Sequence, residues 1–277
     1  MSKNLIPCIL LFTLLFVVGY YDTLSWMLDR YLSPDSYYSH GFFIPIVTGY
    51  LIWLKRDELK RIEIRTSWAG FALVILAALL HLFGTVVYIF SISGFSIWIL
   101  LVGCCLFIYG WARTREIIFP LLFLFFMFPA PLAIISKISF PLKMLVANYG
   151  VKIVALAGLP VYREGFNIII PQGTLLVGNP CSGLRSLITF LALGSLFAYL
   201  SNLSSVRKWV LFFLAVPVAL LSNLLRVPLL ILWSYKYGLA AAAPDTLVHT
   251  GSGFFVFILG ILLLYFALYC LGGTREA

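Results

Sequence analysis

The stretch RKWVLFFLAVPVALLSNLLRVPLLILWS, residues 207–234, decides the fold class of this chain. A helix needs about 20 mostly apolar residues to cross the hydrocarbon core of a bilayer. Residues 207–234 exceed that length, so they predict a membrane-spanning helix. Pro217 and Pro228 lie inside the run, and they predict that this helix is kinked or split into two.

The rest of the chain has the same character. Hydrophobic residues make up 62% of the 277 positions and charged residues 10%, against about 25% charged residues in an average soluble domain. Seven further apolar runs lie at residues 4–21, 40–54, 67–89, 95–112, 116–131, 181–200 and 248–271. We therefore predict an all-α polytopic membrane helical bundle with about eight transmembrane helices. No room remains for a soluble domain of normal size, so residues 1–277 are expected to form a single integral membrane domain.

The long segment between two of these runs, residues 132–180, has a different pattern. Lysines interrupt the apolar residues of 137–157, which favours a helix lying along the membrane interface, with a crossing helix as the alternative. Residues 166–170 and 174–177 are strand-like and are separated by the turn residues 171–173. They predict a short, outward-facing β-hairpin just before the cysteine helix.

Basic residues indicate which loops face the cytoplasm. Five of them lie between Lys55 and Arg65, which makes this loop the strongest cytoplasmic marker of the chain. The expected location is the cytoplasmic (inner) membrane, with residues 132–180 and 235–247 outside. The formal net charge of +9 fits this bias and the attraction of anionic lipids. Membrane lipids are thus expected partners and nucleic acid is not, because the basic residues form no cluster on a soluble face.

The segment GNPCSGLR, residues 178–185, is the first candidate for chemistry. Asn179 can cap a helix and Pro180 suits its first position, which places Cys181 in the first turn. Backbone N–H groups and the helix dipole favour a thiolate there, and Arg185 adds a positive charge on the same helix face. Cys181 is therefore a candidate nucleophile. The alternative is a small packing residue in a tight cap.

Arg226 and His249 are the other two candidates. A guanidinium inside an apolar run costs roughly 2.5 to 3.5 kcal/mol on insertion scales, so Arg226 is expected to be functional unless it reaches the outer interface. Asn223, one turn earlier, could orient it. His249 opens the last run, as a proton-transferring group or as an interfacial hydrogen-bonding residue. With Cys181, these residues would provide a nucleophile, a proton carrier and an oxyanion-stabilising group at the outward ends of three runs, which suffices for acyl transfer.

Other kinds of chemistry lack a signature in the sequence. The five cysteines form no C-x-x-C pair, and the chain has no H-E-x-x-H motif, no G-x-S-x-G motif and no phosphate-binding glycine loop. We therefore expect no metal and no cofactor. No pair of carboxylates lies inside the apolar runs, which argues against an aspartyl protease. His81 lies in the middle of a run and is interpreted as structural.

These motifs together resemble the exosortase and archaeosortase family, membrane enzymes that are similar to transpeptidases. The similarity extends over about residues 37–265. Its motifs are NPCSGLRS at 179–186, NLLRVP at 223–228, His249, and the stretch from Tyr38 to Trp53. The resemblance implies a cysteine peptidase or transpeptidase that cleaves C-terminal sorting signals, of the PEP-CTERM kind, on secreted proteins at the outer face of the membrane. It also implies a thioester acyl-enzyme.

The resemblance assigns the catalytic roles to Cys181, Arg226 and His249, with Arg185 and Asn223 as possible auxiliary residues. His40, also auxiliary, would either shape the substrate entrance or cap the second span. The implied partners are protein substrates with a C-terminal transmembrane sorting signal. Two alternatives remain open: a small-solute membrane transporter, and a scaffold subunit of an exopolysaccharide export system.

Overall fold

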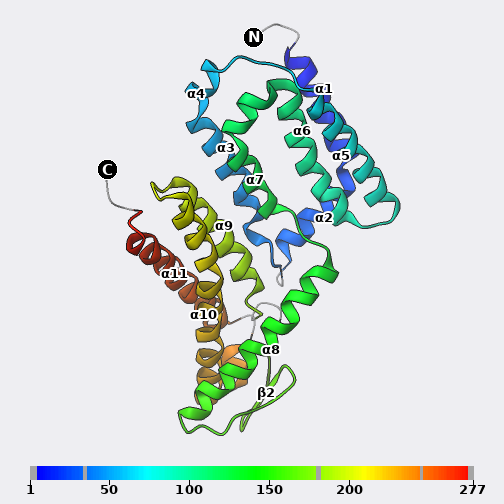
Figure 1. Ribbon diagram of the computed structural model, residues 1–277. Coiled ribbons are helices and arrows are strands. Elements are labelled where there is room, and N and C mark those ends of the chain that lie inside the picture. The colour runs from blue at the N-terminus through cyan, green and yellow to red at the C-terminus, as the bar shows by residue number, and fades with distance from the viewer. Residues whose placement is uncertain (1–4, 34–35, 179–181, 244–245, 274–277) are drawn as a thin grey trace. The chain divides into compact units, whose positions relative to one another are not determined.

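The computed structural model describes residues 5–33, 36–178, 182–243 and 246–273 (Figure 1). In this part of the chain, helices account for nearly all of the secondary structure, and one small antiparallel sheet accounts for the rest. The predicted helical, polytopic membrane fold is confirmed.

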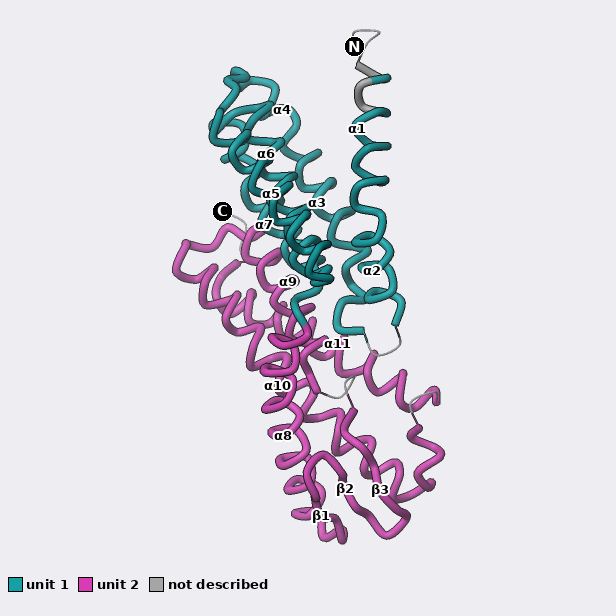
Figure 2. The backbone as a smooth tube through the Cα atoms, turned by 90° about the vertical axis from the view of Figure 1, so that its right-hand side faces the viewer, with its two compact units in different colours: residues 1–131 teal, residues 132–277 magenta. Residues whose placement is uncertain are grey.

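The chain divides into two compact units, residues 1–131 and 132–277, and each is described by itself (Figure 2). Unit 1 contains α1 (Leu5–Gly19), α2 (Tyr21–Leu32), η1 (Ser39–Phe42), α3 (Phe43–Leu54), α4 (Arg56–Arg61), α5 (Trp68–Val86), α6 (Phe90–Glu116), α7 (Ile118–Phe123) and η2 (Leu124–Met127). Unit 2 contains α8 (Leu132–Leu156), β1 (Tyr162–Glu164), β2 (Asn167–Ile170), β3 (Gly173–Leu176), α9 (Leu184–Leu200), α10 (Ser205–Tyr237), η4 (Leu239–Ala242) and α11 (Leu247–Cys270). The single-domain organisation stays a prediction.

Each of the eight predicted apolar runs corresponds to helical structure. Among the described residues, five helices are long and apolar enough to cross a membrane: α5, α6, α8, α10 and α11. A sixth span results if the bent pair of residues 10–19 and 21–32, with a 71° bend, is one span. The remaining runs form shorter apolar helices at Ser39–Leu54, Ile118–Met127 and Leu184–Leu200. The predicted count of eight is therefore supported only roughly.

Two elements differ from the expected boundaries. Helix α8 begins at Leu132 rather than near residue 137, and it is 25 residues long. Helix α10 is one helix of 33 residues with Pro217 and Pro228 inside it, so the alternative of two separate helices is wrong. Both helices are lengthened by packing within unit 2, which local composition does not reveal.

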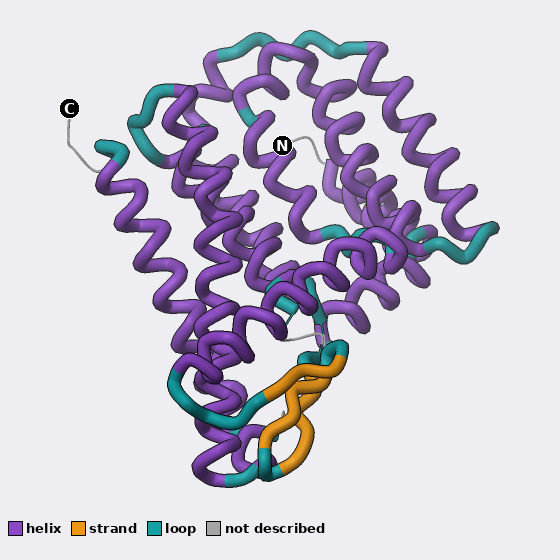
Figure 3. Tube along the Cα trace, turned by 60° about the horizontal axis from the view of Figure 1, so that its bottom comes forward, coloured by secondary structure: helices purple, strands orange, loops and turns teal. Residues whose placement is uncertain are grey.

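The sheet contains the predicted hairpin and one strand more (Figure 3). Strands β2 and β3 pair in the antiparallel sense, with Ile170 opposite Gly173 across the loop of Pro171 and Gln172. Strand β1 was not predicted. It has three residues, and pairing with β2 rather than its own sequence pattern defines it.

A polar cluster fixes the bend between α1 and α2 in unit 1. Ser93 shares hydrogen bonds with Thr23 at 2.6 Å and with His81 at 2.7 Å. The hydroxyl groups of Tyr20 and Ser96 are 3.0 Å apart, and the Tyr20 ring lies 3.9 Å from the His81 ring. His81 is thus hydrogen-bonded between helices, as its structural interpretation requires.

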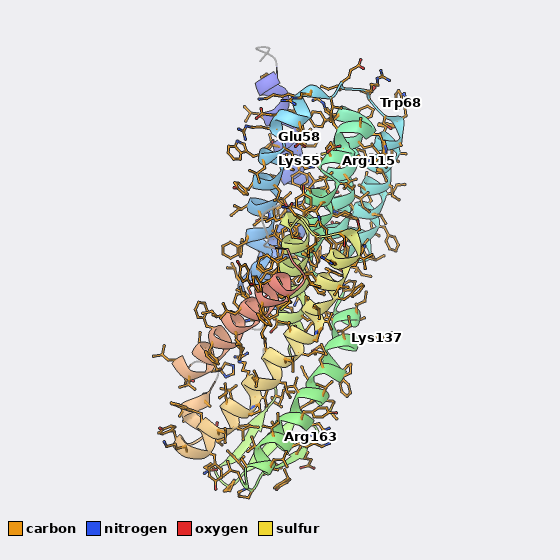
Figure 4. The ribbon with its side chains drawn as sticks, turned by 60° about the vertical axis from the view of Figure 1, so that its left-hand side comes forward. Lys55, Glu58, Trp68, Arg115, Lys137 and Arg163 are labelled. Atoms are coloured by element: carbon orange, nitrogen blue, oxygen red, sulfur yellow. The ribbon has the colours of Figure 1, made fainter. Side chains whose placement is uncertain are left out.

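Charged residues gather at one end of unit 1. Lys55 forms ion pairs with Glu116 at 3.3 Å and with Glu58 at 3.9 Å. Figure 4 shows Lys55, Glu58 and Arg115 near the same end of this unit, with Trp68 beside them. The basic loop after α3 and the basic end of α6 therefore lie on one side of unit 1, as the loop charges predict.

Candidate functional site

Helices α9, α10 and α11 form a layer with one apolar core. This core includes Phe190 of α9, Leu211 and Ala215 of α10, and Leu264 of α11. The Phe190 ring stacks on Phe257 of α11 at 5.4 Å. Helix α10 runs antiparallel to both neighbours, because residues near its start meet the ends of α9 and α11 and residues near its middle meet their beginnings.

Two contacts between α10 and α11 measure the thickness of this layer. At one end Arg207 donates to the Leu271 carbonyl at 3.2 Å, and at the other end Arg226 reaches Ser252 at 3.4 Å. The two contacts are 19 residues apart on each helix, from Arg207 to Arg226 on α10 and from Ser252 to Leu271 on α11. A helix of that length spans about 28 Å, close to the roughly 30 Å of a hydrocarbon core. Arg226 therefore lies near the membrane boundary opposite Arg207.

Beyond Arg226, α10 continues into a second core that we call the cap. The cap core contains Val146, Ala147 and Val154 of α8, Ile168 and Ile170 of β2, Val177, Val227, Leu230 and Ile231 of α10, and Ala242 of η4. The side chain of Gln172 donates to the Tyr235 carbonyl at 2.6 Å and joins the hairpin loop to the end of α10. The site of Arg226 thus lies between a layer as thick as the hydrocarbon core and a cap that carries the sheet.

The contacts between the cap and α8 indicate which part of α8 lies in the hydrocarbon core. By length and composition α8 counts as a candidate span. Its residue Phe140, however, packs edge-on against Phe166 next to β2, and Met144 contacts Arg163 of β1. A sheet with open edges is not stable in lipid, because its unpaired backbone groups would have no water to bind. The half of α8 beside the sheet therefore lies outside the hydrocarbon core.

The guanidinium of Arg226 is held on the first turn of α11. Its Nε donates to Ser252 Oγ at 3.4 Å, and its Nη2 donates to the His249 carbonyl at 3.1 Å. Ser252 Oγ donates to the same carbonyl at 2.8 Å, which leaves its lone pairs to accept from Arg226. Arg226 is 9% exposed, so its side chain is buried at this level rather than extended into water. Its function and the interfacial alternative both stay predictions.

Gly253 makes this close approach possible. A Cβ on Gly253 would lie 3.3 Å from the central carbon of the Arg226 guanidinium and 3.3 Å from Nη2. A side chain at residue 253 would therefore require the guanidinium to shift by a few tenths of an ångström. The small residue after Ser252 is part of the arginine site.

His249 belongs to the first turn of α11, as predicted. Thr246 caps this helix, and its hydroxyl accepts from the His249 backbone N–H at 3.2 Å. The imidazole Nδ1 lies 3.3 Å from the Ala242 carbonyl at the end of η4. This contact fixes the ring between the cap and the start of α11.

Asn223 connects the site to the segment that contains the cysteine motif. It is buried one turn before Arg226, and its side-chain amide nitrogen lies 3.0 Å from the position of a Cβ on Gly183. Gly183 has a φ of 78°, which favours glycine, and it directly precedes α9. Asn223 therefore contacts the start of α9, in addition to its predicted relation to Arg226.

The predicted start of this helix is wrong by about three residues. Ser182 and Gly183 are not helical, and α9 begins at Leu184. The helical spacing that was expected to place Arg185 on one face with Cys181 is interrupted at Gly183. Cys181 lies outside the described residues, as do Asn179 and Pro180. Arg185 itself lies in the first turn of α9.

His40 lies in unit 1. It belongs to η1, and its ring stacks on the Tyr38 ring at 6.0 Å. Tyr38 precedes η1, and its hydroxyl accepts from the Ala130 N–H at 3.1 Å. Burial raises the pKa of the Tyr38 phenol, so that it remains protonated. Both alternatives for His40, a place at a substrate entrance and a cap of the second span, stay predictions.

The structure thus brings together Arg226, His249 and Asn223, from two helices, beside the start of a third. A cation and an imidazole are two of the groups that acyl transfer requires, and Cys181, the candidate thiol, lies outside the described residues. Sequence reasoning missed Ser252 and Gly253. The sequence gives one signal for them, the small residues of the segment TGSG directly after His249. In the described residues, no group of three His, Cys, Asp or Glu could hold a metal ion.

The chain was compared with protein families, curated proteins and solved structures. A family model described as transmembrane exosortase (Exosortase_EpsH) matches residues 26–266, which include every predicted site residue. Neither a curated protein nor a solved structure matches the chain.

Proposed function

The chain belongs to the transmembrane exosortase family, and from this premise we propose that it is a membrane cysteine peptidase or transpeptidase. Its substrates are secreted proteins with a C-terminal sorting signal, a short motif followed by a transmembrane helix and a basic cluster, as in PEP-CTERM tails. One observation supports this proposal above all: the Arg226 guanidinium is held on the turn of α11 that carries His249. A buried cation and a histidine at one point of a membrane helix bundle suit a reaction that develops negative charge on oxygen.

The reaction begins at Cys181. Its thiolate attacks the carbonyl carbon of the scissile peptide bond, and the carbonyl electrons move to oxygen. Arg226 stabilises this oxyanion. As the C–N bond breaks, protonated His249 transfers its proton to the leaving amine, and a thioester to Cys181 remains. Neutral His249 then takes a proton from water or an amine, which attacks the thioester and releases the thiolate.

The site faces the outside of the cytoplasmic membrane in this proposal. Arg207 and Lys208 mark one side of the α9–α11 layer, and basic residues favour the cytoplasm. The cap lies at the other end of the layer, beyond Arg226. Substrate tails that remain in the membrane after secretion would therefore present their scissile segment at the level of the cap.

Two other functions are compatible with a multi-pass membrane protein, a small-solute transporter and a scaffold subunit of an exopolysaccharide export system. Neither needs a thiol. Replacement of Cys181 by serine distinguishes them, because transport or scaffolding would survive this change and a thioester mechanism would not.

The direct test is tail processing in cells. A secreted reporter with a sorting-signal tail from the same genome is expressed with wild-type protein or with Cys181→Ala, Arg226→Ala or His249→Ala. We expect processing by wild type and loss of at least about 100-fold in each variant at normal membrane levels, as for members of one catalytic group. Unchanged processing by Cys181→Ala would exclude the acyl-enzyme mechanism.

A further inference from the structure

The sheet of the cap has two edges with different protection. Its strand order is β1–β2–β3, so β1 and β3 are both edge strands. An edge strand presents unpaired backbone N–H and C=O groups, which can bind another extended chain unless charges, prolines or other elements prevent it. The two edges can therefore be compared within one sheet.

Hydrogen bonding determines which residues of β3 face outward. The N–H of Val177 donates to the Phe166 carbonyl at 3.0 Å, and β3 pairs with β2 in antiparallel register from there. Hydrogen-bonded pairs alternate along such a ladder. Leu175 and Gly173 therefore direct their backbone groups toward β2, and Thr174 and Leu176 direct theirs away from the sheet.

These outward groups are open. The structure gives no hydrogen bond to the backbone of Thr174 or Leu176 on that side, within the parts of the chain that it describes. Leu176 is 69% exposed, and Thr174 is also exposed. Leu239 of η4 packs against Gly173, at the start of the strand. The edge therefore offers two N–H and two C=O groups to an extended chain.

The edge formed by β1 is protected. Only Arg163 directs its backbone groups outward there, because Tyr162 and Glu164 pair with β2. Its side chain donates to the Gly165 carbonyl at 2.8 Å and closes the hairpin. Charged side chains of this kind discourage pairing at an edge. Strand β3 has neither a charged residue nor a proline.

The direction of β3 indicates what binds to it. The strand ends at Leu176, five residues before Cys181 in the sequence. Val177, which continues the strand, shares the buried cap core with Ala242, whose carbonyl contacts the His249 ring. An extended chain paired with β3 would therefore run toward the same segment and the same histidine.

We propose that the open edge of β3 binds the extended segment of the substrate around its scissile bond, as a fourth strand of the sheet. This inference rests on the proposed function. Backbone hydrogen bonds to Thr174 and Leu176 hold the substrate chain, and they are insensitive to its side chains. Recognition of the backbone explains how one enzyme can align the scissile bonds of different secreted proteins beside Cys181.

Disulfide cross-linking tests this pairing. Thr174→Cys is introduced into the Cys181→Ala protein, and single cysteines are placed along the reporter segment that precedes its transmembrane helix. Residues opposite each other on neighbouring strands have Cβ atoms about 5 Å apart, and side chains alternate between the two faces. We expect cross-links at every second reporter position. Arg163→Cys in the same background is the matched control, and it should form none.

A second variant tests the backbone groups in the active enzyme. Leu176→Pro removes the outward N–H and leaves the ladder with β2 intact, so we expect reporter cleavage to fall roughly tenfold, as for one lost hydrogen bond. Leu176→Ala also removes the side chain but keeps the N–H, so it should cleave several times faster than Leu176→Pro, and the difference between the two variants measures the N–H.

The outcomes separate this inference from the proposed function. Cleavage by wild type without cross-links to Thr174→Cys, or with cross-links at every third or fourth position, overturns the pairing and leaves the proposed function intact. Alternating cross-links without cleavage by wild type support the pairing and overturn the proposed function. Neither cleavage nor cross-links would overturn both.

Discussion

Two polar clusters in the described residues each include a partly buried histidine, His81 in unit 1 and His249 in unit 2, and they differ in composition. In unit 1, Thr23 and Ser93, in the first turns of α2 and α6, join His81 of α5 through neutral hydrogen bonds. In unit 2, Arg226 and Ser252 meet at the backbone of His249, in the first turn of α11. The first cluster contains only uncharged partners, whereas the second contains a buried cation.

The difference separates a structural histidine from a candidate catalytic one. The Nδ1 atom of His81 is hydrogen-bonded to the Ser93 hydroxyl, so this ring nitrogen already has a partner from a neighbouring helix. The His249 ring lies where α11 begins, between the membrane layer and the cap. Burial of a polar group alone does not indicate function; the buried cation on the same helix turn marks His249 as the candidate.

The largest effect is expected from Arg226→Lys, which keeps the charge of the second cluster and removes its geometry. A lysine ammonium is a single point charge and cannot span Ser252 and the His249 carbonyl as a guanidinium does. We expect reporter cleavage per folded protein to fall about 100-fold, and Ser252→Ala to lower it about tenfold. The rates are measured in membranes with equal amounts of protein.

Gly253→Ala serves as a geometric control for this result. It leaves Arg226 and Ser252 in place and inserts a methyl group 3.3 Å from the guanidinium carbon. A loss of activity between those of Ser252→Ala and Arg226→Lys would fit the model. Wild-type activity in Arg226→Lys would mean that the positive charge alone is needed for cleavage. The two hydrogen bonds of the guanidinium to Ser252 and to the His249 carbonyl would then have no role in catalysis.

The first cluster is expected to affect stability and not chemistry. Ser93→Ala leaves both Thr23 and His81 without their shared partner, at a cost of about 1 to 3 kcal/mol in the free energy of unfolding. The unfolding temperature in detergent should fall, while cleavage per folded molecule should stay at the wild-type level. A loss of cleavage without a loss of stability would contradict the structural role of His81.

Helices were predictable from the sequence because the bilayer leaves few alternatives. An apolar run such as 207–234 must hydrogen-bond its own backbone N–H and C=O groups within the membrane, and a helix does this without a partner segment. The proximity of Arg226 and His249 was also predictable, because both residues lie at the outward ends of predicted spans. Local composition was sufficient for these features.

The rest depends on contacts between segments that are distant in the sequence. Strand β1 exists because β2 lies beside it. Gly183 has its left-handed conformation at a point where Asn223 of another helix packs against it, and this moves the start of α9 to Leu184. Ser252 became part of the site only through Arg226. No local pattern around these residues encodes such contacts.

The smallest effect is expected for two hydroxyl groups on α10. Ser222 and Ser234 are buried, and their Oγ atoms have no hydrogen-bond partner among the residues that the structure describes. An unsatisfied buried hydroxyl destabilises the folded state, so its removal should cost nothing, unlike the removal of Ser93. We expect Ser234→Ala, and likewise Ser222→Ala, to keep the unfolding temperature in detergent or to raise it by at most about 4 °C.

Ser234 lies in the cap, two turns beyond Arg226, and its replacement should also leave cleavage unchanged. A clear loss of stability in Ser234→Ala would mean that this hydroxyl has a partner in the membrane, and the contrast between paired hydroxyls in unit 1 and unpaired ones on α10 would then fail.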